Sequence, residues 1–129
     1  MPLYMLQLAY TAESWAAMVR KPQDRIEVVA KPVLAKAGCK LVGAWYSFGD
    51  YDMVLIVEAP DAETMASVPM AVAAGGALRS GQTTPLLSGP EGVGAMQKAG
   101  KVLGVYKPPS QTAKPLAMPT EKVAKKGQR

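Results

Sequence analysis

Hydrophobic and polar side chains alternate along four stretches of this chain. Residues 3–10 place an aromatic or aliphatic side chain at every second position, which is the period of a half-buried β-strand. Residues 40–48 and 51–59 are two more strand-like runs, and 77–87 is a fourth. Only Gly49-Asp50 separates the middle two, and glycine in the first turn position is typical of a two-residue type II′ turn. The pattern predicts four strands, with a tight hairpin between the second and third.

Helical periodicity fills the gap between the first and second strands. Thr11 is suited to cap a short helix through Met18, because its hydroxyl can accept from an unpaired backbone amide. Residues 26–37 then carry apolar side chains at helical spacing, and Pro22 suits a first helical position. Pro32 lies inside this pattern and lacks a backbone donor, so we expect a kink or a break there.

A second helical pattern follows the third strand. Asp61 is suited to cap a helix over residues 63–74, and Gly75-Gly76 is suited to end it. Residues 91–99 can form a short extra helix. The order strand-helix-strand-strand-helix-strand is the split βαβ arrangement of ferredoxin-like domains, in which two helices cover one face of a four-stranded antiparallel sheet. The predicted fold class is therefore α+β.

The other face of this sheet is also predicted to be apolar. In residues 40–48 and 51–59 both alternating sets of side chains are largely apolar, whereas a face that meets water normally carries polar residues. A contiguous apolar area of this size is uncommon on a monomer. We therefore expect a second copy of the chain to cover the free face, in a sheet-on-sheet homodimer. In the alternative, the helix at 91–99 folds across that face instead.

The positive charge lies outside the predicted fold. The net charge is +5, but eight of the 15 basic residues lie between Lys98 and Arg129 against one acid, so residues 1–97 carry about −2. Repeated prolines among these lysines predict a disordered, basic tail over residues 101–129. A solvated tail is favoured over a nucleic-acid-binding one, because Tyr106 is its only aromatic side chain for base stacking.

Composition indicates a cytoplasmic protein with a single core. Hydrophobic residues make up 49% of the chain, enough for one buried core. The single Cys39 can form no internal disulfide. Residues 1–15 alternate, and glycine and proline interrupt 64–78, so neither stretch predicts a leader peptide or a membrane segment.

Several kinds of chemistry are excluded because the sequence contains no histidine. A Ser-His-Asp triad, a histidine-ligated metal or haem and histidine acid/base catalysis all require one. Without a histidine to activate it, Cys39 is interpreted as a packed residue rather than a nucleophile. The acids around the hairpin are spread over a turn, a strand and a helix start, so we expect neither a metal site nor a cofactor. These acids are Asp50, Asp52, Glu58, Asp61 and Glu63.

Asp52 is the carboxylate with the most informative position, because it lies just inside the predicted hairpin. A buried carboxylate needs donors or a cation, and Arg25, Arg79 or Tyr46 could supply them. In one interpretation such a pair is structural and fixes the hairpin. In the other, Asp52 is a catalytic base beside Tyr46 or Tyr51, in a pocket between the sheet and the helices.

Aromatic and polar side chains suggest where a ligand could bind. Aromatic residues of the strands and first helix could line an apolar pocket, although packing in the core or at a dimer interface is their commoner role. These are Tyr10, Trp15, Trp45, Tyr46, Phe48 and Tyr51. Arg79 and Thr83 could bind an anion near the end of the last strand, or be a solvated arginine and a strand-forming threonine. The candidate ligand-binding residues are Trp45, Arg25, Arg79 and Thr83.

The segment Ser47-Phe48-Gly49-Asp50-Tyr51-Asp52-Met53-Val54-Leu55-Ile56-Val57-Glu58-Ala59-Pro60-Asp61 resembles the defining segment of the GYD domain family. Residues 4–8, 77–80, 83–87 and 94–100 resemble it as well, so the resemblance covers about residues 2 to 100 and omits the tail. Asp50 stands between Gly49 and Tyr51, giving the Gly-x-Tyr-Asp form. The resemblance implies a ferredoxin-like domain over residues 1–100, akin to dimeric α+β barrel proteins, in a family of poorly defined role.

Two functions are compatible with these features. The chain could be a homo-oligomer that binds a small apolar or aromatic molecule, with or without cofactor-independent catalysis. It could instead be a non-catalytic assembly or regulatory module that binds protein partners through its apolar sheet face and its basic tail. A closed cavity with a polar cluster favours the first function, and a fully packed interface without a cavity counts against it.

Overall fold

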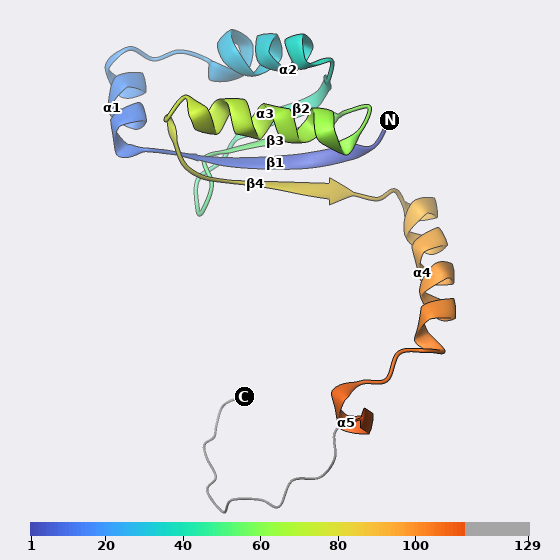
Figure 1. Ribbon diagram of the computed structural model, residues 1–129. Helices are drawn as coiled ribbons and strands as arrows, with labels where there is room; N and C mark the ends of the chain where they lie inside the picture. The colour runs from blue at the N-terminus through green and yellow to red at the C-terminus, as the bar shows by residue number, and fades with distance from the viewer. Residues whose placement is uncertain (113–129) are drawn as a thin grey trace, which may run out of the picture. The chain divides into compact units, whose positions relative to one another are not determined.

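A computed structural model describes residues 1–112 of the chain. Four strands form one antiparallel sheet in the order β2-β3-β1-β4 (Figure 1). They are β1 (Leu3–Tyr10), β2 (Lys40–Tyr46), β3 (Met53–Glu58) and β4 (Leu78–Leu86). The first strand lies in the middle, paired with β3 on one side and with β4 on the other.

The helices that follow the strands cover one face of this sheet. They are α1 (Ala12–Arg20), the π-helical turn η1 (Ile26–Ala30), α2 (Lys31–Ala37) and α3 (Ala62–Ala74). The last two contact each other, and Figure 1 shows them on the same side of the strands. The predicted α+β fold, with ferredoxin-like order of strands and helices, is confirmed.

The core lies between this helix layer and the sheet. Registers such as Leu6 opposite Leu55 place alternate side chains of β1 and β3 on the helix side. These side chains pack against Leu34, Met65 and Val68 from the helices. Burying one such side chain fully contributes about 1.5–3 kcal/mol, so this layer supplies much of the stability of the domain.

The helix caps follow the predictions, with one exception. The Thr11 hydroxyl accepts from the Ser14 amide at 3.0 Å, and the Asp61 carboxylate accepts from the Thr64 amide at 2.7 Å. The exception is Pro22, which was expected to start a helix. Helical structure begins only at Ile26, whose amide is held by the Asp24 carboxylate at 3.0 Å, so Pro22 lies in the preceding connection.

Pro32 marks the break that was predicted for this region. It is the second residue of α2, directly after the π-helical turn η1. Proline lacks the N–H that a continuous α-helix uses, so the change from π-helix to α-helix falls where that donor is missing.

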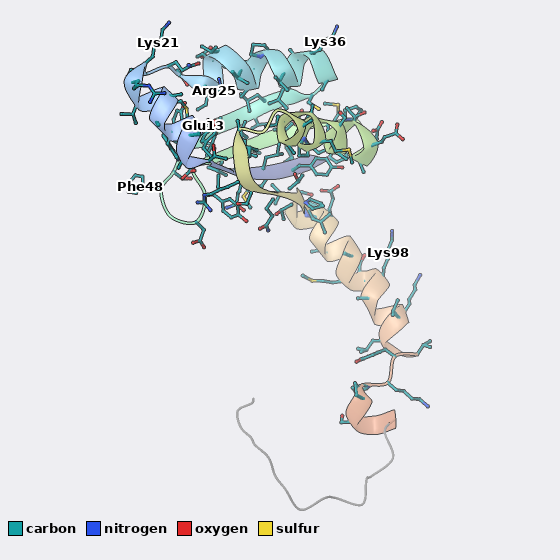
Figure 2. The ribbon with its side chains drawn as sticks, turned by 60° about the vertical axis from the view of Figure 1, so that its left-hand side comes forward. Glu13, Lys21, Arg25, Lys36, Phe48 and Lys98 are labelled. Carbon is teal, nitrogen blue, oxygen red and sulfur yellow. The ribbon has the colours of Figure 1, made fainter. Side chains whose placement is uncertain are left out.

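The predicted two-residue turn at Gly49-Asp50 is wrong. The second strand ends at Tyr46 and the third begins at Met53. The loop is closed by the Ser47 amide, which donates to the Asp52 carbonyl at 2.8 Å. Asp52 is drawn toward the first strand, because its own amide donates to the Leu8 carbonyl at 2.7 Å. A longer loop results, and Figure 2 shows Phe48 projecting from it, fully exposed.

The two faces of β2 also differ from the simple alternation expected. The register shifts between Leu41 and Gly43, so a bulge inserts one extra residue. Ala44 and Tyr46 therefore join Leu41 on the helix side, whereas Gly43 and Trp45 lie on the opposite side. We call that opposite side of the sheet the outer face; its apolar side chains are Leu3, Met5, Trp45, Val54, Ile56 and Leu86.

A second compact unit begins at Pro90. It contains nearly all of α4 (Gly89–Leu103), which is longer at both ends than the helix predicted over 91–99, and α5 (Pro109–Thr112). The described part of the predicted tail therefore includes helical turns, and residues 113–129 lie outside the described residues. None of the helices within residues 1–112 has the length and apolar character needed to cross a membrane.

Candidate functional site

A cavity of about 60 Å³ lies between the inner side of the sheet and the helices η1, α2 and α3. Apart from Tyr10 and Arg25, its walls are apolar. We call it the inner cavity. Its lining residues are Leu6, Leu8, Tyr10, Arg25, Val29, Ala30, Val33, Leu34, Met53, Leu55, Val68, Pro69, Val72, Ala77 and Leu78.

The polar end of the inner cavity is formed by Tyr10 at the end of β1 and by Arg25 just before η1. Burial raises the pKa of the Tyr10 phenol, although the Arg25 guanidinium beside its hydroxyl acts in the opposite direction. The phenol is therefore neutral at physiological pH. Figure 2 shows Arg25 between α1 and α2, and its backbone amide donates to the Tyr46 hydroxyl at 2.8 Å.

Asp52 lies beside this cluster but does not line the cavity. The side chain is buried, with 9% of its surface exposed. One carboxylate oxygen accepts from the Tyr10 amide at 2.8 Å and from the Trp15 indole N–H at 3.1 Å. The expected donors Arg25, Arg79 and Tyr46 are not its hydrogen-bond partners within residues 1–112. The carboxylate instead ties the loop after β2 to β1 and α1.

Trp15 connects these groups. Its ring meets that of Tyr10 edge-on, with the ring centroids 5.6 Å apart and the planes at 77°. The indole N–H donates to Asp52, and this hydrogen bond holds the Trp15 ring against Tyr10. Aromatic edge-to-face contacts of this kind stabilise both rings in one orientation.

Trp45 and Tyr51 lie away from the inner cavity. The Trp45 ring stands on the outer face, 57% exposed, and lies directly over Gly43. A Cβ atom on Gly43 would come within 2.6 Å of that ring. The Tyr51 hydroxyl donates to the Gln82 side-chain oxygen at 2.9 Å.

Arg79 and Thr83 are also separate from the cavity. The exposed Arg79 side chain donates to the Asp50 carbonyl at 3.3 Å and so supports the loop after β2. Thr83 lines a different hollow on the surface between α3 and β4. Of the candidate residues, the structure brings together Arg25 and Tyr46, with Asp52 next to them through Tyr10.

The aliphatic walls of the cavity were not identified from the sequence. Val29, Ala30 and Val33 come from η1 and α2, where helical spacing signals a buried face. That signal does not separate a packed face from one that borders a cavity, because both need the same side chains.

Neither metal ligands nor a reactive thiol were found beside this cluster. Within residues 1–112, no three acidic or cysteine side chains gather as metal ligands would. Cys39 is buried, and burial raises the pKa of its thiol, which lowers the fraction of nucleophilic thiolate.

The sheet order and the helix layer define the class of protein, a ferredoxin-like α+β domain. The crystal structure of MtbAldR is similar with a TM-score of 0.50 and 17% identity, over 67% of this chain and 53% of that chain. This chain thus spans about half the length of that protein. At this identity the similarity shows the fold alone. A crystal structure of an uncharacterized NIPSNAP domain protein from Burkholderia xenovorans matches with a TM-score of 0.42 and 16% identity, over 68% of this chain and 94% of that chain.

The sequence itself identifies the family. The family model of the GYD domain matches residues 4–96 of the sequence, so the chain belongs to the GYD domain family, as the resemblance around Asp52 predicted. No curated protein matches the chain.

Proposed function

We propose that this chain binds a small apolar molecule in the inner cavity. The observation that carries the proposal is an apolar hollow between the sheet and the helices, with a tyrosine and an arginine in its wall. Protein interiors are packed with few voids larger than a water molecule. Side chains that border an empty hollow lose van der Waals contacts on that side, and a bound apolar ligand restores them.

Binding is better supported than catalysis. Tyr10 and Arg25 carry the only polar side chains that line the cavity, and a phenol and a guanidinium are hydrogen-bond donors suited to holding a polar group rather than to removing a proton. Asp52, the expected base, is engaged by two donors outside the cavity wall. The arrangement resembles a recognition site with one polar end and an apolar body.

The proposal includes a homodimer formed through the outer face. That face carries Met5, Val54 and Ile56 in the middle of the sheet, and within residues 1–89 no helix covers it (Figure 1). An antiparallel sheet that meets water usually has polar side chains there. A second copy is the simplest cover, since it buries the same face on both chains.

The test is to fill the cavity. Ala30→Leu adds three carbon atoms at the cavity wall, and Ala35→Leu on the exposed side of α2 is the matched control. Calorimetric titration with 3-methylbutan-1-ol should show binding to the wild-type chain and to Ala35→Leu, and loss of binding to Ala30→Leu. Equal binding to both variants would place the ligand elsewhere, and no binding to the wild-type chain would refute the proposal.

A further inference from the structure

Arg25 is a partly buried cation for which the described chain provides no anion. Within residues 1–112 Arg25 forms no ion pair, in contrast to Lys31, whose ammonium pairs with the Glu27 carboxylate. The nearby Asp52 carboxylate accepts instead from a backbone amide and an indole. The Tyr10 hydroxyl beside the guanidinium is a polar but neutral partner, so it does not balance the positive charge. The inner cavity therefore has a positive end without a fixed counter-ion.

The position of Arg25 lets a ligand reach it from the cavity. Together with Tyr10 and Ala77, Arg25 lines both the inner cavity and a neighbouring hollow of about 200 Å³. These three residues therefore mark where the two spaces meet. A ligand whose apolar end occupies the inner cavity would place its other end at Arg25.

Tyr10 adds a donor at the same place. Its phenol is neutral at physiological pH because burial raises its pKa, so the hydroxyl keeps a proton to donate. Tyr46 acts indirectly, through the backbone of Arg25. Its hydroxyl accepts from the Arg25 amide at 2.8 Å and so fixes the backbone that carries the guanidinium. Tyr46 is thus a positioning residue, and Arg25 with Tyr10 forms the binding pair.

The charge and the volume narrow the class of ligand. One arginine balances one negative charge, as on a carboxylate, whereas a phosphate monoester carries about −1.5 to −2 at pH 7. The cavity of 60 Å³ is less than half of the roughly 150 Å³ in which an engineered protein cavity holds benzene. A short aliphatic tail therefore fits this space better than an aromatic ring.

From these observations, and resting on the function proposed above, we infer that the ligand is a short-chain aliphatic monocarboxylate. Its branched or linear tail occupies the inner cavity, and its carboxylate accepts from the Arg25 guanidinium and the Tyr10 hydroxyl. Arginine binds carboxylates through two parallel N–H donors, which gives directional as well as electrostatic preference.

The inference is tested with three probes that share one tail: 3-methylbutanoate, its neutral amide 3-methylbutanamide, and 3-methylbutylamine. Calorimetry on the full chain at pH 7 should show the carboxylate binding roughly tenfold to a hundredfold tighter than the amide, as expected for hydrogen bonds to a charged group. The amine should bind weakest. Benzoate should bind less tightly than 3-methylbutanoate if the tail is limited by volume.

Variants separate this inference from the proposed function. Arg25→Gln should lower the affinity for the carboxylate to that for the amide, and Arg25→Lys should keep part of the difference between them. The control Arg20→Gln, on the exposed end of α1, should leave both affinities unchanged. Equal affinities of carboxylate and amide for the wild-type chain would overturn the inference and leave the proposed function intact. Absence of binding by all three probes would overturn both. The wild-type comparison decides the matter even where Arg25→Gln fails to fold.

Discussion

Asp52 joins three parts of the chain through a single carboxylate oxygen. The loop after β2 carries it, β1 donates the Tyr10 amide, and α1 donates the Trp15 indole N–H. Both donors sit beside the polar end of the inner cavity, since Tyr10 lines that end and Trp15 packs on Tyr10. Asp52 therefore fixes the positions of Tyr10 and Trp15 without lining the cavity.

Removing this carboxylate should weaken the fold. Asp52→Ala leaves a buried amide without an acceptor and should cost about 3 kcal/mol, whereas Asp52→Asn keeps one oxygen acceptor and should cost about half as much. Urea denaturation measures both. Asp50→Asn, in the exposed loop two residues earlier, is the control and should change little. A stable Asp52→Ala variant would show that the two hydrogen bonds do not hold the loop.

The sequence predicted that Asp52 is buried and paired but not with which partners. A carboxylate in an apolar strand context signals a need for donors. Backbone amides carry no sequence signal, and Trp15 is 37 positions away. Only the fold brings these donors to Asp52. Charge and side-chain chemistry alone point instead to the arginines and Tyr46.

At the scale of elements, most strands and helices were predictable because each repeats a period. The four strands and the helix after Asp61 follow alternation, helical spacing and caps. The turn at Gly49 and the bulge after Leu41 were not predictable in this way. Both depend on which neighbour a strand pairs with, and a local pattern does not contain that information.

The packing of the Trp45 ring over β2 is expected to depend on glycine at position 43. A methyl group there would meet the Trp45 ring at 2.6 Å, so Gly43→Ala should displace the ring from its place on the outer face. The two tryptophans give two indole N–H signals in NMR spectra, and the Trp45 signal should move while the Trp15 signal stays. Gly81→Ala is the control, because its new methyl meets neighbours only at 3.6 Å. Unchanged indole signals in Gly43→Ala would contradict this packing.

The cap of α3 predicts a pH dependence. The hydrogen bonds from Thr64, its backbone amide first, hold the pKa of Asp61 below its ordinary value near 3.8. A depressed folded-state pKa means that this stabilisation is present above the unfolded value and is lost as pH falls through the folded one. The urea midpoint of Asp61→Asn should therefore lie below the wild-type midpoint at pH 7, and the difference should shrink below about pH 4. A constant difference down to pH 2 would mean that the charge contributes nothing.

At the scale of the whole molecule, the outer face brings together apolar side chains from β1, β2 and β3. If it forms the dimer interface, Ile56→Lys should place a charge at its centre and yield a monomer. Met70→Lys, on the exposed surface of α3, is the matched control and should stay dimeric. Sedimentation velocity distinguishes the two. A monomeric wild-type chain at tens of micromolar would contradict the dimer.

The family and the fold are shown by the family match and the sheet order, whereas the proposed function depends on the inner cavity. The similarity to MtbAldR supports the ferredoxin-like fold and does not identify a ligand. The basic residues of the chain are concentrated from Lys98 onward. Among the residues that line the cavity, Arg25 is the one cation.

Methyl NMR of the full chain, titrated with 3-methylbutan-1-ol, tests the inner cavity most directly. Ligand contact should shift the methyl signals of Leu6, Val33 and Leu55, which line the cavity, and leave those of Ile56 and Leu86 on the outer face unchanged. Shifts confined to the outer face, or no shift at saturating ligand, would contradict binding between the sheet and the helices.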